Sequence, residues 1–197
     1  MKQLLYIITL GAALFFLQAC GTTSGTSKGN SSLNLKDPTN WPEKTNDKLG
    51  FKAESPLYKA DGTFRKWVFG KINMPNDDIT RLNAVVYIDI NSVYERTIRL
   101  TQDLKTEQYL DGTNHPIAKA TIRDVSLIED DRYKAKVDLE LKGTTQELDT
   151  EFVLTKNGNV LHVKGDMIVA RQDFKVGADK MKSIKNEVLI YYDTDLK

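Results

Sequence analysis

The C-terminal part of the chain contains three consecutive segments in which apolar and polar residues alternate. They span residues 133–141, 146–155 and 159–171. A period of two is the pattern of a β-strand that buries one face. The pair Asn157-Gly158 between the last two segments predicts a type I′ hairpin turn, and Gly143 predicts a second hairpin. We therefore expect an antiparallel meander with one apolar face and one polar face.

A sheet with one apolar face must be covered or must close on itself, and the chain carries little helix to cover it. Further strands are expected at residues 49–55, 63–74, 82–90 and 118–127 and around Ile190, with a turn at residues 59–62. Ser92 is the expected N-cap of a helix that ends near Leu104, and a change of phase near Asp124 predicts a β-bulge. The expected fold is therefore all-β, an eight-stranded antiparallel barrel with one short helix inserted after the third strand.

The charge balance limits the class of partner. The 197 residues carry a formal net charge of +1, and 40% of them are hydrophobic, which suits one globular domain with a sizeable core. Lys2 is the one charged residue before Cys20, so the remainder of the chain is neutral. Because phosphate binding needs an excess of basic residues on some face, we expect no nucleic acid as a partner.

The N-terminus has the pattern of a secretory signal. Lys2 precedes an apolar run over residues 4–17, which is shorter than a bilayer span. The sequence Leu17-Gln18-Ala19-Cys20 resembles the lipobox of bacterial lipoproteins, which implies cleavage before Cys20 and acylation of that residue. The alternative is a plain secretory signal followed by a free cysteine. Cys20 is the only cysteine, so no disulfide can form within the chain, and we expect Cys20 to be the lipid-attachment site.

The expected domain organisation has three parts. Residues 1–19 form a lipoprotein signal peptide, residues 20–48 hold the acylated cysteine and a flexible linker, and residues 49–197 form the barrel domain. Because Gly21 is not Asp, the resemblance to lipoprotein signals favours the outer membrane. The expected location is thus the cell envelope, with the barrel lipid-anchored and facing the periplasm.

Several short motifs follow one another along the barrel region. They are Asp89-Ile90-Asn91-Ser92; Asp103-Leu104-Lys105-Thr106 with Tyr109-Leu110-Asp111 and Pro116; residues 139–145; Arg171-Gln172-Asp173-Phe174 with Gly177; and Val188-Leu189-Ile190-Tyr191. In this order and spacing they resemble the YceI-like family of lipid-binding barrels, over residues 49–197. The resemblance implies a lipocalin-like barrel whose interior holds a long isoprenoid chain, such as a polyprenyl quinone or a related lipid.

The interior of an eight-stranded barrel is either filled with side chains or open to one small ligand. Small residues at or near inferred inward positions favour a cavity: Gly70, Ala84, Ala118, Ala120, Ala135 and Gly165. The residues expected to line it are Phe51, Val86, Ile88, Leu104, Ala120, Ile122, Ala135, Val137, Leu139, Phe152, Leu154, Leu161, Val163, Met167, Val169, Phe174 and Ile190. The alternative is a tightly packed barrel with small residues where strands cross closely.

Arg171 is the candidate for binding a lipid head group. It continues the inward phase of Met167 and Val169 at the end of the barrel. The alternative is a structural clasp, in which Arg171 pairs with Asp173 or with a loop carbonyl.

No motif brings together a nucleophile, a base and an orienting group, so we do not expect an enzyme. His115 and His162 are too few for a zinc site without matched carboxylates, and no metal or cofactor is expected apart from a bound polyprenyl quinone or similar lipid. The main hypothesis is a carrier or sequestering protein for an isoprenoid or other long-chain lipid, attached to the membrane through its lipid anchor. The alternative is a structural or interaction lipoprotein with a packed barrel, which binds a partner through Tyr191, Trp67 or Phe69; a homodimer is also considered.

Overall fold

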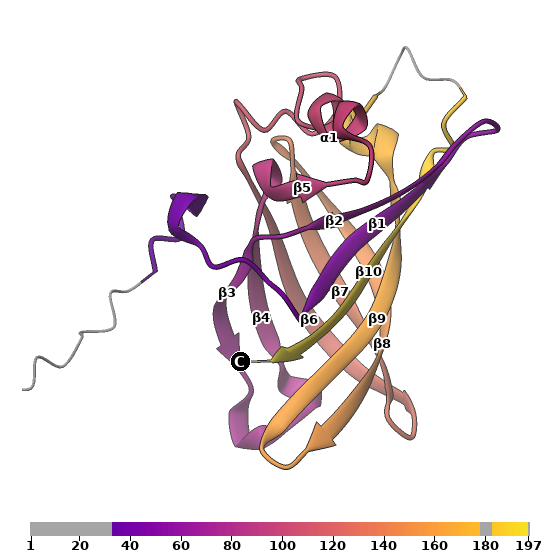
Figure 1. Cartoon of the computed structure of the whole chain (residues 1–197). Coiled ribbons are helices and arrows are strands. Elements are labelled where there is room, and N and C mark those ends of the chain that lie inside the picture. Colours follow the sequence, from indigo (N-terminus) through magenta and orange to yellow (C-terminus); the bar gives the residue numbers. More distant parts are fainter. Residues whose placement is uncertain (1–32, 178–182, 197) are drawn as a thin grey trace, which may run out of the picture. The chain divides into compact units, whose positions relative to one another are not determined.

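The computed structural model describes residues 33–177 and 183–196, which contain a ten-stranded sheet (Figure 1). Its strands are β1 (Lys48–Glu54), β2 (Lys59–Phe64), β3 (Trp67–Asn73), β4 (Asn83–Asp89), β5 (Val93–Tyr94), β6 (Ile117–Glu129), β7 (Arg132–Leu141), β8 (Thr144–Asn157), β9 (Val160–Ala170) and β10 (Glu187–Leu196). Neighbouring strands pair antiparallel in the order β3-β4-β6-β7-β8-β9-β10-β1-β2-β5. The helical elements are α1 (Ile98–Leu104) and the 3-10 turns η1 (Pro38–Asn40), η2 (Pro75–Asp77), η3 (Ile79–Arg81), η4 (Ile90–Ser92) and η5 (Arg171–Phe174).

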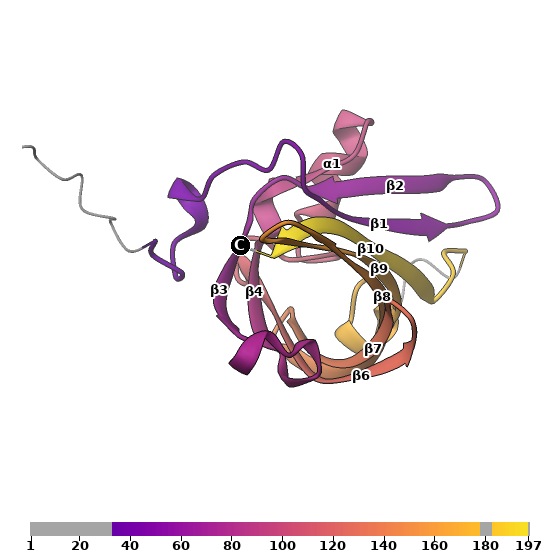
Figure 2. The ribbon, with the colours of Figure 1, turned by 90° about the horizontal axis from the view of Figure 1, so that it is seen from below.

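The sheet curls around a central space, as the end-on view in Figure 2 shows. β3 and β5 are the terminal strands in the pairing order. Near the end of the barrel that carries α1, backbone hydrogen bonds outside the strand pairing connect the residues just before β3 to those just before β5. The amide of Arg65 donates to the carbonyl of Ser92 at 3.2 Å, and the amide of Asp89 donates to the carbonyl of Lys66 at 3.0 Å. The all-β, antiparallel fold expected from the alternating segments is therefore present.

The expected number of eight strands is wrong. The single strand expected at residues 63–74 is interrupted, so that its first residues belong to β2 and the rest to β3. β5 has only two residues, which is too short for an alternating pattern to reveal it. α1 consequently follows the fifth strand of the chain and not the third.

Residues 59–62 lie within β2 and do not form the expected turn. The chain turns earlier, where the amide of Ser55 donates to the carbonyl of Tyr58 at 2.8 Å. Gly62 serves close packing instead, because a Cβ at this position would lie 2.5 Å from the Phe51 ring. Asp-Gly is a common turn signal, and here the glycine has a different role.

The expected helix begins later than residue 92. Ser92 is not an N-cap, because its Oγ donates to the carbonyl of Asp89 at 2.6 Å and accepts from the amide of Lys66 at 3.0 Å. These bonds hold the connection between β4 and β5. α1 begins at Ile98, after the N-cap residue Thr97.

Both hairpin turns of the meander lie where they were expected, and their backbone geometries differ from each other. The loop between β8 and β9 is Gly158-Asn159, in which Gly158 alone has a positive φ, of 62°. Glycine at the first central position is the arrangement of a type II′ turn and not of the predicted type I′ turn. In the loop between β7 and β8, Lys142 and Gly143 both have positive φ, of 52° and 71°, which matches type I′.

The β-bulge predicted near Asp124 is confirmed. The register between β6 and β7 shifts between Arg123 and Ser126, and Asp124 has a φ of 54°. After this shift Val125 is buried in the core, where the uninterrupted alternation of β6 would have turned it outward.

Residues 33–47, within the segment expected to be a linker, pack against the barrel. Trp41 is buried, and its Nε1 donates to the carbonyl of Asn34 at 2.9 Å. The amide of Lys44 donates to the carbonyl of Arg65 at 2.7 Å. This segment therefore covers part of the outer side of the sheet near β3.

The predicted signal peptide, residues 1–19, and the predicted lipid-attachment site at Cys20 lie outside the described residues. In the part of the chain that the structure describes, no helix has the length and hydropathy needed to cross a membrane.

Candidate ligand-binding cavity

The inner face of the curled sheet surrounds a cavity of about 310 Å³. Every strand except β5 contributes side chains to its wall, and nearly all of these side chains are apolar. This follows from the two-residue period of the strands, which points alternate side chains to the same face. Leu100 and Leu104 of α1 also line the cavity, at the end of the barrel where Figure 1 shows this helix.

Most of the residues predicted to line a cavity do line this one. They are Phe51, Val86, Ile88, Leu104, Ala120, Ile122, Val137, Leu139, Phe152, Val163, Met167, Val169 and Ile190. They come from strands far apart in the sequence and from α1, and the curl of the sheet brings them together. Arg171 also borders the cavity.

The other predicted lining residues lie elsewhere. Ala135 and Phe174 are buried in packed clusters and do not reach the cavity wall. Leu154 is half-buried and packs against the cluster that contains Phe152. Leu161 is half-buried near the β8–β9 turn. Periodicity identified the face of the sheet, and it could not tell which inward positions meet a neighbouring side chain instead of open space.

Several lining residues were not predicted. Trp67 and Phe69 lie in a segment with apolar residues on both faces, so its alternation did not assign an inner side. Phe64 follows the residues that were interpreted as a turn. Thr150 and Tyr192 line the cavity with polar side chains, which an apolar pattern does not reveal.

Alanine side chains make room for the cavity. Ala84, Ala118 and Ala120 are buried and form part of its wall. The small residues Gly70 and Gly165 have another role, since a Cβ would lie 2.3 Å from the Tyr87 ring at Gly70 and 2.4 Å from a backbone carbonyl oxygen at Gly165. Of the small residues considered, the alanines on β4 and β6 thus explain the open volume best.

A buried polar pair lies within the apolar wall. The Thr150 Oγ1 bonds to the carbonyl oxygen of Asp166 at 2.9 Å and to the Tyr192 hydroxyl at 2.7 Å. Burial raises the pKa of Tyr192 to about 12, because the phenolate would lose its hydration. The phenol is therefore neutral at physiological pH, and the two hydroxyls satisfy each other.

Arg171 is bonded to loop carbonyls. Its Nε donates to Lys185 at 3.0 Å, its Nη1 to Val176 at 2.7 Å and to Gly177 at 3.0 Å, and its Nη2 to Ile184 at 2.9 Å. The guanidinium thereby joins the segment after β9 to the segment before β10. This geometry favours the structural clasp over the head-group role.

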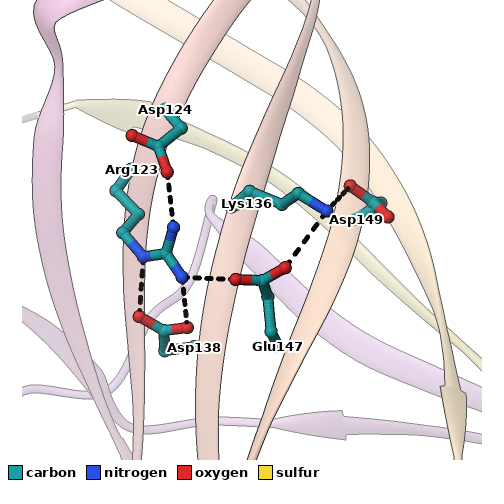
Figure 3. A network of polar contacts seen from close by, with 6 residues as sticks. All are labelled: Arg123, Asp124, Lys136, Asp138, Glu147 and Asp149. Carbon is teal, nitrogen blue, oxygen red and sulfur yellow. Dashed lines mark hydrogen bonds and ion pairs between the residues drawn. The ribbon is translucent and has the colours of Figure 1, made fainter.

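The outer face of the same strands is charged, as Figure 3 shows for six residues. Arg123 on β6 makes a bidentate pair with Asp138, with both distances 2.8 Å, and contacts Glu147 at 2.6 Å and Asp124. Lys136 continues the network to Glu147 at 3.2 Å and to Asp149 at 2.9 Å. Hydrogen bonding to Arg123 lowers the pKa of Asp138 and of Glu147. The carboxylates are thus ionised at neutral pH and hold three strands together on the solvent side.

His162 lies on the outer face of β9 between two carboxylates of β10. Its Nδ1 is 2.9 Å from Asp195 Oδ1, and its Nε2 is 2.9 Å from Asp193 Oδ1. The bond to Asp195 is the largest cause of a raised pKa at His162, because a protonated ring donates to both acids. When the ring is protonated, the arrangement is a cross-strand ion pair.

A comparison with known protein families matches residues 43–196 to the YceI-like domain. This match spans all ten strands. A comparison with curated proteins gives no match.

Solved structures with the same fold include BcnA of Burkholderia cenocepacia, with a TM-score of 0.71 and 16% identity over 77% of this chain and 96% of that chain. A second is a polyisoprenoid binding domain from Saccharophagus degradans implicated in plant cell wall breakdown, with a TM-score of 0.60 and 14% identity over 76% of this chain and 92% of that chain. A third is the YCEI protein of Campylobacter jejuni, with a TM-score of 0.59 and 16% identity over 68% of this chain and 82% of that chain. At these identities the likeness concerns the fold.

Proposed function

Because the chain belongs to the YceI-like domain family, we propose that it binds a polyisoprenoid or a similar amphiphile inside the barrel. In this proposal the protein is a carrier or sequestering protein and performs no catalysis. One structural neighbour is described as a polyisoprenoid binding domain, which supports the same class of ligand.

The observation that carries this proposal is the apolar cavity enclosed by the sheet. A long hydrocarbon chain gains about 0.8 kcal/mol for each methylene group that it removes from water, before the costs of ordering it. The wall offers few polar groups for a small polar ligand to bind, and most of its polar groups are engaged in bonds within the protein. A long apolar chain therefore suits this cavity better than a polar metabolite does.

The proposed setting is the cell envelope. The lipobox-like sequence that ends at Cys20 supports a lipid anchor, and Gly21 after it favours the outer membrane with the barrel facing the periplasm. An anchored barrel would receive and release its lipid close to a membrane surface.

The alternative of a surface-binding lipoprotein with a packed barrel has less support. Trp67 is buried, and Phe69 lines the cavity, so neither is the surface anchor that this alternative requires. The Tyr191 hydroxyl donates to Asp61 at 3.0 Å. The expected use of these aromatic residues as exposed anchors is therefore wrong for Trp67 and Phe69.

The proposal is tested by lipid uptake. The delipidated full chain is mixed with a prenyl quinone in detergent and examined by native mass spectrometry for a one-to-one complex. Ala118→Leu, which fills part of the cavity from β6, is expected to weaken retention about tenfold, since overpacking costs about 1–3 kcal/mol. Thr121→Leu on the outer face of the same strand serves as the matched control and should retain the lipid. Failure of the folded wild-type protein to take up any prenyl lipid would contradict the proposal.

A further inference from the structure

Trp67 lines the cavity, and its indole nitrogen Nε1 is buried without a hydrogen-bond acceptor among the described residues. Trp67 begins β3, lies opposite Ile88 in the register with β4, and is 2% exposed. Because nearly all buried N–H groups in proteins have an acceptor, an unpaired one at a cavity wall points to an acceptor supplied from the cavity.

The surroundings of Trp67 do not supply that acceptor. The buried cluster around it consists of Phe51, Ile88, Ile90, Val93, Leu104, Leu110 and Ala118, all of them apolar. The Phe69 ring lies edge-to-face with the indole at 5.6 Å between centroids, which is at most a weak partner for an N–H. Lys44 Nζ lies 4.3 Å from the indole ring and is itself a donor.

The charged residues of the cavity wall restrict the kind of acceptor. Arg171 and Glu54 are the charged lining residues among those described. Arg171 is bonded to loop carbonyls, and Glu54 pairs with Lys59 at 3.3 Å and with Lys185 at 2.8 Å. A buried anionic head group could lean only on the Arg171 guanidinium, whose donors already bond to loop carbonyls, to offset its lost hydration. An uncharged oxygen acceptor needs only a hydrogen-bond donor.

We propose that Trp67 determines the specificity of the cavity by donating its indole N–H to an uncharged oxygen acceptor of the bound lipid, such as a quinone or ester carbonyl. The inference rests on the proposed lipid-binding function and adds a chemical requirement to it. The ligand combines a long apolar chain with a neutral acceptor that lies near the start of β3. A hydrocarbon without oxygen leaves the donor unpaired.

The test compares two ligands and two variants of the full chain. The ligands are a short-chain prenyl naphthoquinone, which carries carbonyl acceptors, and squalene, which has none. Trp67→Phe removes the N–H and keeps an aromatic ring. It is expected to weaken quinone binding about fivefold to tenfold, as for one lost hydrogen bond, and to change squalene binding by less than about twofold. Trp41→Phe is the matched control, because it removes the other indole N–H, which donates to Asn34 outside the cavity, and it should leave both affinities unchanged.

A measurement on the unmodified chain gives the same answer without relying on a variant that folds. With ¹⁵N-labelled tryptophan, the indole signal of Trp67 should move downfield when the quinone binds and move little with squalene. Equal losses for both ligands in Trp67→Phe, or no loss for the quinone, would overturn the role of Trp67. If the wild type binds neither ligand, the proposed function itself fails.

Discussion

The two faces of strands β6 to β9 use the same backbone for opposite purposes. On β7, Val137 and Leu139 point inward and line the cavity, whereas Lys136 and Asp138, which alternate with them, point outward and form ion pairs. The inner positions are constrained in size and polarity because they define an enclosed volume. At the outer positions only the pairing of opposite charges across neighbouring strands is constrained. Most of these side chains remain in contact with water. Alternate residues of one strand should therefore respond very differently to the same substitution.

The largest difference is expected for a polar substitution on either face of β7. Val137→Asn places an amide in the apolar wall and should lower the free energy of unfolding by about 2–4 kcal/mol, through lost burial and an unpaired amide. Lys134→Asn on the outer face of the same strand should change it by less than about 0.5 kcal/mol. Urea denaturation of both variants measures the contrast, and similar losses would show that the two faces are not distinguished as described.

The arginines Arg171 and Arg123 give the next contrast. Arg171→Met removes a buried guanidinium and leaves several loop carbonyls without their donor, so unfolding should become about 2–3 kcal/mol easier. Arg123→Met removes an exposed network, and its smaller effect should diminish as salt is added. Thermal denaturation at low and high salt separates them. Loss of lipid binding in a fully stable Arg171→Met protein would instead favour the head-group role for this residue.

The smallest effect is expected at His162. Its pKa is raised in the folded protein, so the protonated ring stabilises the fold fully below its ordinary pKa of about 6.5. The contribution is lost as the pH rises through the raised pKa of the folded state. Since the ring is partly exposed, the contribution should be less than about 1 kcal/mol. The stability difference between wild type and His162→Gln should therefore shrink from pH 6 to alkaline pH, and a difference that grew with pH would contradict this assignment.

The strand meander could be predicted from the sequence because its two faces differ in polarity at almost every position. The prediction failed where that difference is absent. Trp67 and Phe69 have apolar neighbours on both sides, so the alternation gave no inner face. Gly62 and Ser92 carried the signals of a turn and of a helix cap, and the three-dimensional contacts use them for close packing and for a strand connection.

The candidate cavity could be predicted in part for the same reason. The inward residues of the meander follow from periodicity, which explains why Val137, Leu139 and Val163 were identified. The exclusion of Phe174, which fills the core instead of facing open space, depends on packing in three dimensions. The unpaired indole of Trp67 depends on which groups surround one atom, and no sequence period carries that information.

Binding of a lipid in the cavity can be tested by organic extraction of the full chain purified from a bacterial host, followed by mass spectrometry of the lipids against a control protein. We expect a prenyl lipid in about one-to-one ratio with the protein, carrying an uncharged oxygen-containing head group, and much less of it in Ala118→Leu. A stably folded protein whose extract contains no such lipid, and which also takes up no added prenyl quinone, would contradict the claim that the cavity holds a lipid.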